Sequence, residues 1–235
     1  MKETLALKTW LPDDFPTQAN EKTIWDNWNL QLQQGSTKGN PKGKINDRTH
    51  QWLPPLKQRY KLNFDGASKG NPGKAGFGGI FRDYKGSPLL IYLGNIGWDT
   101  NNSAELEGLW QGILLAENHD FQPLEIEGDS QLLINMATQL LNGAHANKIS
   151  TSWRLEARLE AIENTLNHNR AIIFKHVRRE SNKVADLLAN MGVEYKHPLL
   201  AGNLDIIQNH EQKQECNTLL QKEANSPNAG DSLRT

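Results

Sequence analysis

The chain has 235 residues, of which 37% are hydrophobic and 23% are charged, with 27 acidic and 26 basic side chains. This balance is typical of a soluble globular protein with a core, and it excludes a histone-like basic protein and an acidic solvating tail. No apolar run approaches the roughly 20 residues of a membrane span, and the first residues lack the features of a secretory signal. The single cysteine, Cys216, excludes an internal disulfide framework and a cysteine-based zinc site. We therefore expect a soluble intracellular protein with no membrane partner.

The composition changes twice along the chain and predicts three regions. Residues 1–58 are rich in Asn, Gln, Lys and Pro, and are expected to form an arm with a short helix around Trp25 and Trp28, followed by a linker. Residues 59–195 show regular hydrophobic periodicity and are predicted to form the folded domain, with about as many basic as acidic residues. Residues 196–235 are polar and poor in aromatic residues, which predicts a loose and partly disordered tail.

Strand and helix patterns alternate within the central region. Expected strands cover 60–65, 76–82, 89–94, 123–129 and 171–174, and expected helices cover 104–118, 130–141, 152–167 and 182–191. Asn102 or Ser103 is expected to cap the first of these helices. The first three strands follow one another as an antiparallel meander, and the later strands are reached through helical crossovers. This order predicts a mixed α/β domain whose five-stranded mixed sheet is covered by helices.

Four carboxylates stand at the ends of these expected elements. Asp65 ends the first strand and Asp129 ends the fourth, whereas Glu105 and Asp186 each lie in the first turns of a helix. The first and fourth strands are expected to be parallel neighbours, so Asp65 and Asp129 would lie side by side at one edge of the sheet. Converging carboxylates repel one another unless a hard cation neutralises them, and oxygen-only ligands favour Mg²⁺ or Mn²⁺. The pattern therefore predicts a divalent metal site.

Short motifs surround the four carboxylates. They are Asp65-Gly-Ala-Ser-Lys-Gly-Asn-Pro-Gly73, Thr100-Asn-Asn-Ser-Ala-Glu-Leu106, Gly128-Asp-Ser-Gln131, and His176-Val-Arg-Arg-Glu-Ser-Asn182 followed by Asp186. In these motifs the chain resembles type 1 ribonuclease H, closest to the domain found in plant retroelements and their domesticated relatives. The resemblance covers roughly residues 60–195. It implies the ribonuclease H-like fold and an endonuclease that hydrolyses the RNA strand of RNA–DNA hybrids.

The resemblance also implies a role for individual residues. Two Mg²⁺ ions, or Mn²⁺ in their place, would be held by Asp65, Glu105, Asp129 and Asp186, and cleavage would leave 3′-hydroxyl and 5′-phosphate ends. His176 would lie on a mobile loop that assists product release. Contacts to sugar hydroxyls and base edges of the hybrid are expected from Gly66, Asn71, Asn102 and Gln131, and contacts to the DNA strand from Thr100 and Asn101.

The chain also departs from well-studied members of that family. Residues 142–149 are too few for the extra helix and basic handle with which some members grip substrate. Because the domain is also close to neutral, affinity for a hybrid is expected to be modest and salt-dependent, and a polymerase or another partner domain is expected to supply grip.

Two alternatives to a hybrid-specific nuclease stay open at this point. One is a catalytically inactive nucleic-acid-binding domain left by a decayed retroelement, against which the presence of all four carboxylates weighs. The other is a different nuclease of the same fold superfamily that cuts duplex DNA, against which the residues following Asp65 and Asp129 weigh.

Overall fold

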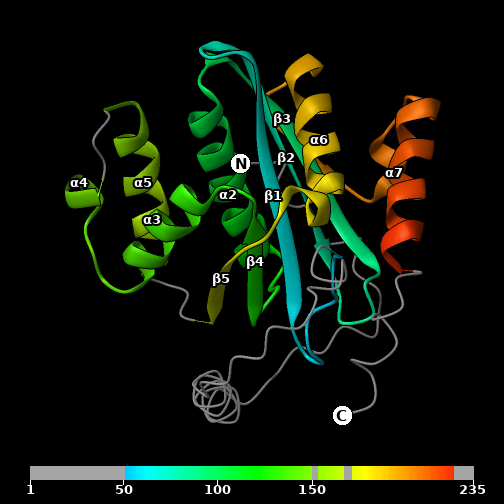
Figure 1. Ribbon diagram of the computed structural model, residues 1–235, viewed down its shortest axis with the longest axis horizontal. Coiled ribbons are helices and arrows are strands. Elements are labelled where there is room, and N and C mark those ends of the chain that lie inside the picture. Colours follow the sequence, from blue (N-terminus) through cyan, green and yellow to red (C-terminus); the bar gives the residue numbers. More distant parts are fainter. Residues whose placement is uncertain (1–50, 150–152, 167–170, 225–235) are drawn as a thin grey trace, which may run out of the picture. The chain divides into compact units, whose positions relative to one another are not determined.

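The computed structural model of the protein describes residues 51–149, 153–166 and 171–224 (Figure 1). The helix expected around Trp25 and Trp28 lies outside the described residues, as do residues 225–235 of the expected tail.

A six-stranded mixed sheet forms the centre of the domain. Its strands are β1 (Tyr60–Gly70), β2 (Gly73–Arg82), β3 (Pro88–Asp99), β4 (Leu124–Gly128), β5 (Ile172–His176) and β6 (Leu200–Gly202), arranged in the order β5-β4-β1-β2-β3-β6. Strand β4 is parallel to both β1 and β5, and the remaining pairs are antiparallel. The expected meander and the parallel neighbours β1 and β4 are confirmed. The sequence predicts five strands, one fewer than the sheet contains. The strand not predicted is β6, which has only three residues and lies in the region whose composition predicts a tail.

Helices cover both faces of the sheet. They are α2 (Asn101–Asn118), α3 (Gln131–Leu141), the single turn α4 (Ala146–Ile149), α5 (Trp153–Leu166), α6 (Lys183–Glu194) and α7 (His210–Ala224), with 3-10 turns η3 (Arg179–Ser181) and η4 (Leu204–Ile206). Helices α2, α3 and α5 lie on one side of the sheet, and α6 and α7 lie on the other (Figure 1). None of the helices among the described residues is both long and apolar enough to cross a bilayer.

Helix α6 lies very close to the sheet because glycines of β2 face it. A Cβ atom added at Gly76 would come within 2.2 Å of the Val193 backbone, and one added at Gly78 within 2.5 Å of the Leu188 backbone. On the other face, Leu62 of β1 packs beneath α2 next to Gly112. The two glycines of β2 therefore fix the distance of α6 from the sheet, and with it the position of Asp186 on that helix.

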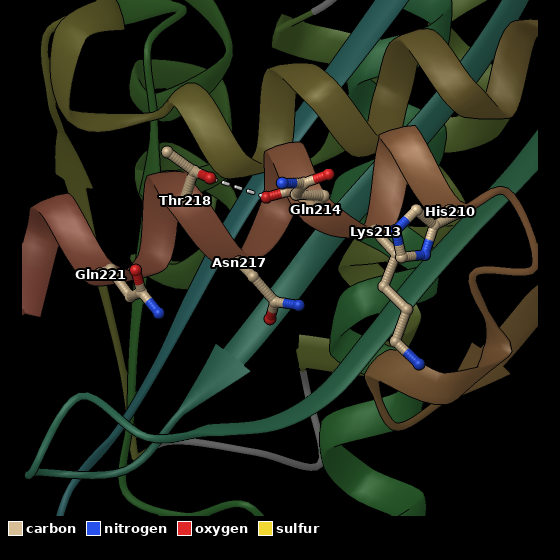
Figure 2. A pocket seen from close by; sticks show the side chains of 6 residues that line it. All are labelled: His210, Lys213, Gln214, Asn217, Thr218 and Gln221. Carbon is tan, nitrogen blue, oxygen red and sulfur yellow. Dashed lines mark hydrogen bonds between the residues drawn. The ribbon is translucent and has the colours of Figure 1, made fainter.

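The carboxy-terminal region differs from the expected loose tail. Residues 200–224 form β6, η4 and α7, and Cys216 of α7 is fully buried in a cluster with Ile80, Ile91 and Leu188. The buried and half-buried positions of α7 recur three or four residues apart, which is the period of a helix with one buried side. The other side of α7 is polar. Figure 2 shows six of its side chains, which line a pocket: His210, Lys213, Gln214, Asn217, Thr218 and Gln221.

The folded domain also begins before residue 59. Trp52 is buried, and its indole Nε1 donates a hydrogen bond to Asn63 Oδ1 at 2.8 Å. The guanidinium of Arg82 lies 4.2 Å from the centre of the same indole ring and pairs with Glu223 of α7 at 2.9 Å. One buried arginine thus links the lead-in to β1 with the last described helix.

Removing the partner of this arginine should destabilise the whole domain. Arg82 is 1% exposed and Glu223 is 13% exposed, so Glu223→Ala would leave a buried guanidinium without its counter-charge. Breaking a buried ion pair in this way typically costs about 3–5 kcal/mol of the free energy of unfolding. Urea denaturation of the full chain measures the loss.

Glu215→Ala is the matched control, because Glu215 lies on the same helix with an exposed side chain. It should change the free energy of unfolding by less than about 0.5 kcal/mol. Equal effects of the two variants would show that α7 does not form part of the folded core.

Candidate active site

Three carboxylates converge at the carboxyl end of β4. Asp65, Glu105 and Asp129 each offer an oxygen atom, and these atoms all lie within 4.8 Å of one another. The pairing of β1 with β4 ends at Asn63 and Glu127, so Asp65 and Asp129 both lie just beyond it. Asp129 follows β4, as expected, whereas Asp65 does not end its strand. Strand β1 continues to Gly70 as one arm of a long hairpin with β2.

Glu105 reaches the cluster because helix α2 begins close to β1. The side chain of Thr100 caps the helix by accepting a hydrogen bond from the Ser103 backbone N–H, so neither Asn102 nor Ser103 is the cap. A Cβ atom added at Gly66 would lie 2.1 Å from the Glu105 backbone nitrogen, an impossible contact. Glycine at position 66 therefore lets the first turn of α2 approach the strand that carries Asp65.

Burial and mutual repulsion make the cluster costly to ionise. Burial, and then the charges of Asp129 and Glu105, raise the pKa of Asp65 to about 8, although the Gly66 N–H donates a hydrogen bond to its carboxylate at 2.8 Å. Burial and the charge of Asp129 likewise raise the pKa of Glu105 to about 7. Within the described ranges, neither Asp65 nor Glu105 forms an ion pair with a lysine or an arginine. The protein thus brings these carboxylates together without neutralising them.

Asp186 lies near this cluster and not within it. It occupies the first turn of α6, as expected, and its carboxylate Oδ1 accepts a hydrogen bond from Arg179 Nη2 at 2.8 Å. Its charge also helps to raise the pKa of Asp65 and of Asp129, for both of which burial is the larger cause. The fourth expected metal ligand is therefore close enough to act electrostatically on the cluster, and it is held by a basic side chain.

His176 lies beside the cluster at the end of β5. Its ring Nε2 is 3.0 Å from the backbone oxygen of Asp129, and the residue is exposed. This exposed position leaves the imidazole accessible to a bound substrate.

The other expected substrate contacts fall into two places. Asn71, Thr100 and Asn101 lie together where the β1–β2 turn meets α2, because the Asn101 backbone N–H donates to Asn71 Oδ1 at 3.2 Å. Asn101 also donates to Glu105 Oε1 at 2.7 Å and so connects this place with the carboxylates. Asn102 lies half-buried in the same first turn of α2.

Gln131 stands apart from that group. It is exposed at the start of α3, two residues after Asp129, and donates to Asn135 Oδ1 at 2.9 Å.

Sequence reasoning assigned no role to two residues that shape the site. Asn182 is buried, and its Nδ2 donates to the backbone oxygen of Phe64 at 2.9 Å, which ties the loop before α6 to β1 next to Asp65. The other is Arg179, which pairs with Asp186. Both lie in the motif that begins at His176, but no periodicity connects a loop arginine with a helix carboxylate seven residues later.

Comparison with known proteins places this site in a family. The family model described as reverse transcriptase-like matches residues 63–192. A protein of Arabidopsis thaliana with a provisional ribonuclease H name is 34% identical over 139 residues, which are 59% of this chain and 21% of that protein. Ribonuclease HI of Halobacterium salinarum is 31% identical over 152 residues, covering 65% of this chain and 73% of that protein. Ribonuclease HI of Streptomyces coelicolor is 38% identical over 97 residues, and the chain spans 41% of it.

Solved structures agree with the sequence comparison. The ribonuclease H1 structure from Halobacterium salinarum matches with a TM-score of 0.51 and 31% identity, over 58% of this chain and 98% of that one. The amino-terminal ribonuclease H domain of a Mycobacterium tuberculosis protein also matches with a TM-score of 0.51, at 26% identity, over 58% of this chain and 94% of that one. The chain therefore belongs to the reverse transcriptase-like family, and its ribonuclease H-like domain includes residues 63–192.

Proposed function

We propose that the protein is a metal-dependent endonuclease that hydrolyses the RNA strand of RNA–DNA hybrids. The observation that carries the proposal is the cluster of Asp65, Glu105 and Asp129, in which neither Asp65 nor Glu105 has a basic partner among residues 51–149, 153–166 and 171–224. Relatives named ribonuclease H support the substrate class, among them a protein of which the chain covers 73%.

The cluster fits a divalent cation better than it fits a structural ion pair. Glu125, four residues before Asp129, shows the contrast. Burial would raise its pKa, but Lys61 at 2.7 Å and Lys175 at 2.6 Å hold that pKa at about 2. Asp65 has no such partner in the part of the chain that the structure describes, and its pKa is raised to about 8. A hard cation with oxygen ligands, such as Mg²⁺ or Mn²⁺, would supply the missing positive charge.

The four carboxylates would divide between two cations. Asp65 would contact both, Glu105 and Asp129 would hold one, and Asp186 would hold the other after leaving Arg179. Two bound cations stabilise the charge that develops on the attacking water and on the leaving oxygen of a phosphodiester. Water would attack phosphorus as the bond to the 3′ oxygen breaks, which would leave 3′-hydroxyl and 5′-phosphate ends.

Neighbouring residues would orient the hybrid against the carboxylates. Thr100 and Asn101, grouped with Asn71 at the start of α2, would contact the DNA strand. Gly66, Asn71, Asn102 and Gln131 would contact sugar hydroxyls and base edges, since sensing the 2′-hydroxyl is how a protein distinguishes RNA from DNA. The exposed His176 would assist the release of product. A polymerase or another partner domain would add affinity that a near-neutral domain lacks.

Replacing Asp65 by Asn should abolish cleavage of a labelled hybrid in Mg²⁺. The variant removes a ligand shared by both cations, and the loss of a single electrostatic contact at an active site already costs about 10²–10³ in rate. We expect a loss of at least about a thousandfold, with the hybrid binding measured in Ca²⁺ changed far less.

Asp83→Asn is the control for this substitution. Asp83 lies in the β2–β3 loop, where its Oδ1 accepts hydrogen bonds from the Lys85 and Ser87 backbone N–H groups, and an asparagine oxygen can accept both. Its rate should stay near that of the unmodified protein. Near-normal hydrolysis by Asp65→Asn would exclude the proposed catalytic site. If the folded, unmodified protein binds a hybrid and never cleaves it, the protein is a binding domain and not a nuclease.

Asp65→Asn should also change how the stability of the protein depends on pH when divalent ions are removed with EDTA. The pKa of Asp65 is raised in the folded protein to about 8 from an ordinary value of 3.8, so the folded state holds a proton that the unfolded chain releases. The unmodified protein should therefore lose stability between about pH 4 and pH 8. Asp65→Asn should be more stable than the unmodified protein at pH 8.5, by no more than about 6 kcal/mol, because each unit by which a pKa is raised corresponds to about 1.4 kcal/mol.

Urea denaturation at pH 5 and pH 8.5 tests this expectation. Adding Mg²⁺ at pH 8.5 should stabilise the unmodified protein and have much less effect on Asp65→Asn. If both proteins respond to pH and to Mg²⁺ in the same way, the cluster carries no ionisation cost.

A further inference from the structure

Arg179 places a positive charge at the rim of the carboxylate cluster. Its Nη2 lies 2.8 Å from Asp186 Oδ1, and its side chain is 74% exposed. The charge reaches further than this one pair. Burial raises the pKa of Asp129 and Arg179 opposes that effect, and Arg179 also interacts with the charge of Asp65. One guanidinium thus acts on three of the four carboxylates.

Because of this arginine, the four carboxylates differ in how readily a cation can bind them. Asp65 and Glu105 have no basic partner among the described residues, so a cation can approach them without displacing a positively charged side chain. Asp186 already shares a carboxylate oxygen with a guanidinium. A cation that binds this carboxylate competes with Arg179 for it, since two positive charges at contact distance from one carboxylate repel each other.

The loop that carries Arg179 can release the side chain without unfolding. Asn182 holds the end of that loop through its buried hydrogen bond to the Phe64 backbone, and Ser181 is buried beside it. Arg179 itself lines a surface pocket, together with Lys183, Asp186 and Asn190. Because the guanidinium is mostly exposed, breaking its ion pair costs little free energy.

We propose that Arg179 is a positioning residue that holds Asp186 until a second cation binds, so that the two metal positions fill in a fixed order. This inference rests on the proposed function. The first cation binds the cluster of Asp65, Glu105 and Asp129, and Arg179 keeps the carboxylate of Asp186 oriented while its position is without metal. The second cation binds more weakly because it competes with the arginine for that carboxylate.

Titration of the full chain with Mn²⁺, without nucleic acid, tests the inference independently of cleavage. The spectrum of free Mn²⁺ in electron paramagnetic resonance counts the bound ions. The unmodified protein should bind one Mn²⁺ ion tightly and a second more weakly. Arg179→Ala should raise the affinity for the second ion by roughly twofold to fivefold, which is the effect expected from the loss of an exposed ion pair. Arg179→Lys, which keeps the charge, should tighten it less.

Two controls separate a specific contact from a general effect of charge. Arg178→Ala removes the same charge from the same loop and should leave the second affinity within about a factor of 1.5 of its original value. In the Asp186→Asn background the second ion should be lost whether position 179 is arginine or alanine, because Asp186 is its ligand and the two residues act as a pair.

The possible failures are distinguishable. Equal tightening by Arg178→Ala and Arg179→Ala, or a second ion that still binds in the Asp186→Asn background, would overturn the role of Arg179 and leave the cluster of Asp65, Glu105 and Asp129 intact as a metal site. Weaker binding of the second ion by Arg179→Ala would also overturn the role of Arg179. Mn²⁺ binding that does not depend on Asp65 would overturn the metal site of the proposed function itself.

Discussion

The site depends on one constraint: carboxylates are held together at the end of β4, and Asp65 and Glu105 have no basic partner within the described residues. A buried carboxylate normally acquires a lysine or an arginine, as Glu125 does with Lys61 on the same strands. For Asp65 and Glu105 burial is the largest reason that ionisation is unfavourable, and the neighbouring charge of Asp129 adds to it. An arrangement that costs the folded protein stability persists only if the structure around it is rigid enough to impose it.

That rigidity comes from contacts on both faces of the sheet. On one face, glycine at position 66 brings the start of α2 against β1 and carries Glu105 to Asp65. On the other face, the glycines of β2 set the distance of α6, which carries Asp186. Asn182 then ties the loop before α6 back to the strand of Asp65. Each carboxylate is thus placed by backbone packing, and the site depends on small residues as much as on charged ones.

Local sequence pattern is enough to predict part of this arrangement. Alternation in β1 and the helix period of α2 predict these elements, and the expected parallel pairing of β1 with β4 correctly places Asp65 beside Asp129. The contact between Arg179 and Asp186 could not be predicted in this way, because it joins a loop to a helix and depends on side-chain direction. The cap of α2 was misplaced by two or three residues, since Thr100, Asn102 and Ser103 are all acceptable capping residues and only the path of the chain selects among them.

The carboxy-terminal helix was missed for a different physical reason. Its buried side consists of few apolar residues, so the average composition of the segment is polar even though Cys216 and Leu220 are spaced as in a helix. The buried pair of Glu223 and Arg82 also connects α7 to the sheet, and no local pattern reveals it because the two residues are far apart in sequence. The family model ends at residue 192, within α6, whereas α7 packs on that same helix. The segment beyond the family match is therefore connected with the Asp186 side of the site, and the β1–α2 contacts that assemble Asp65 and Glu105 lie on the opposite face of the sheet.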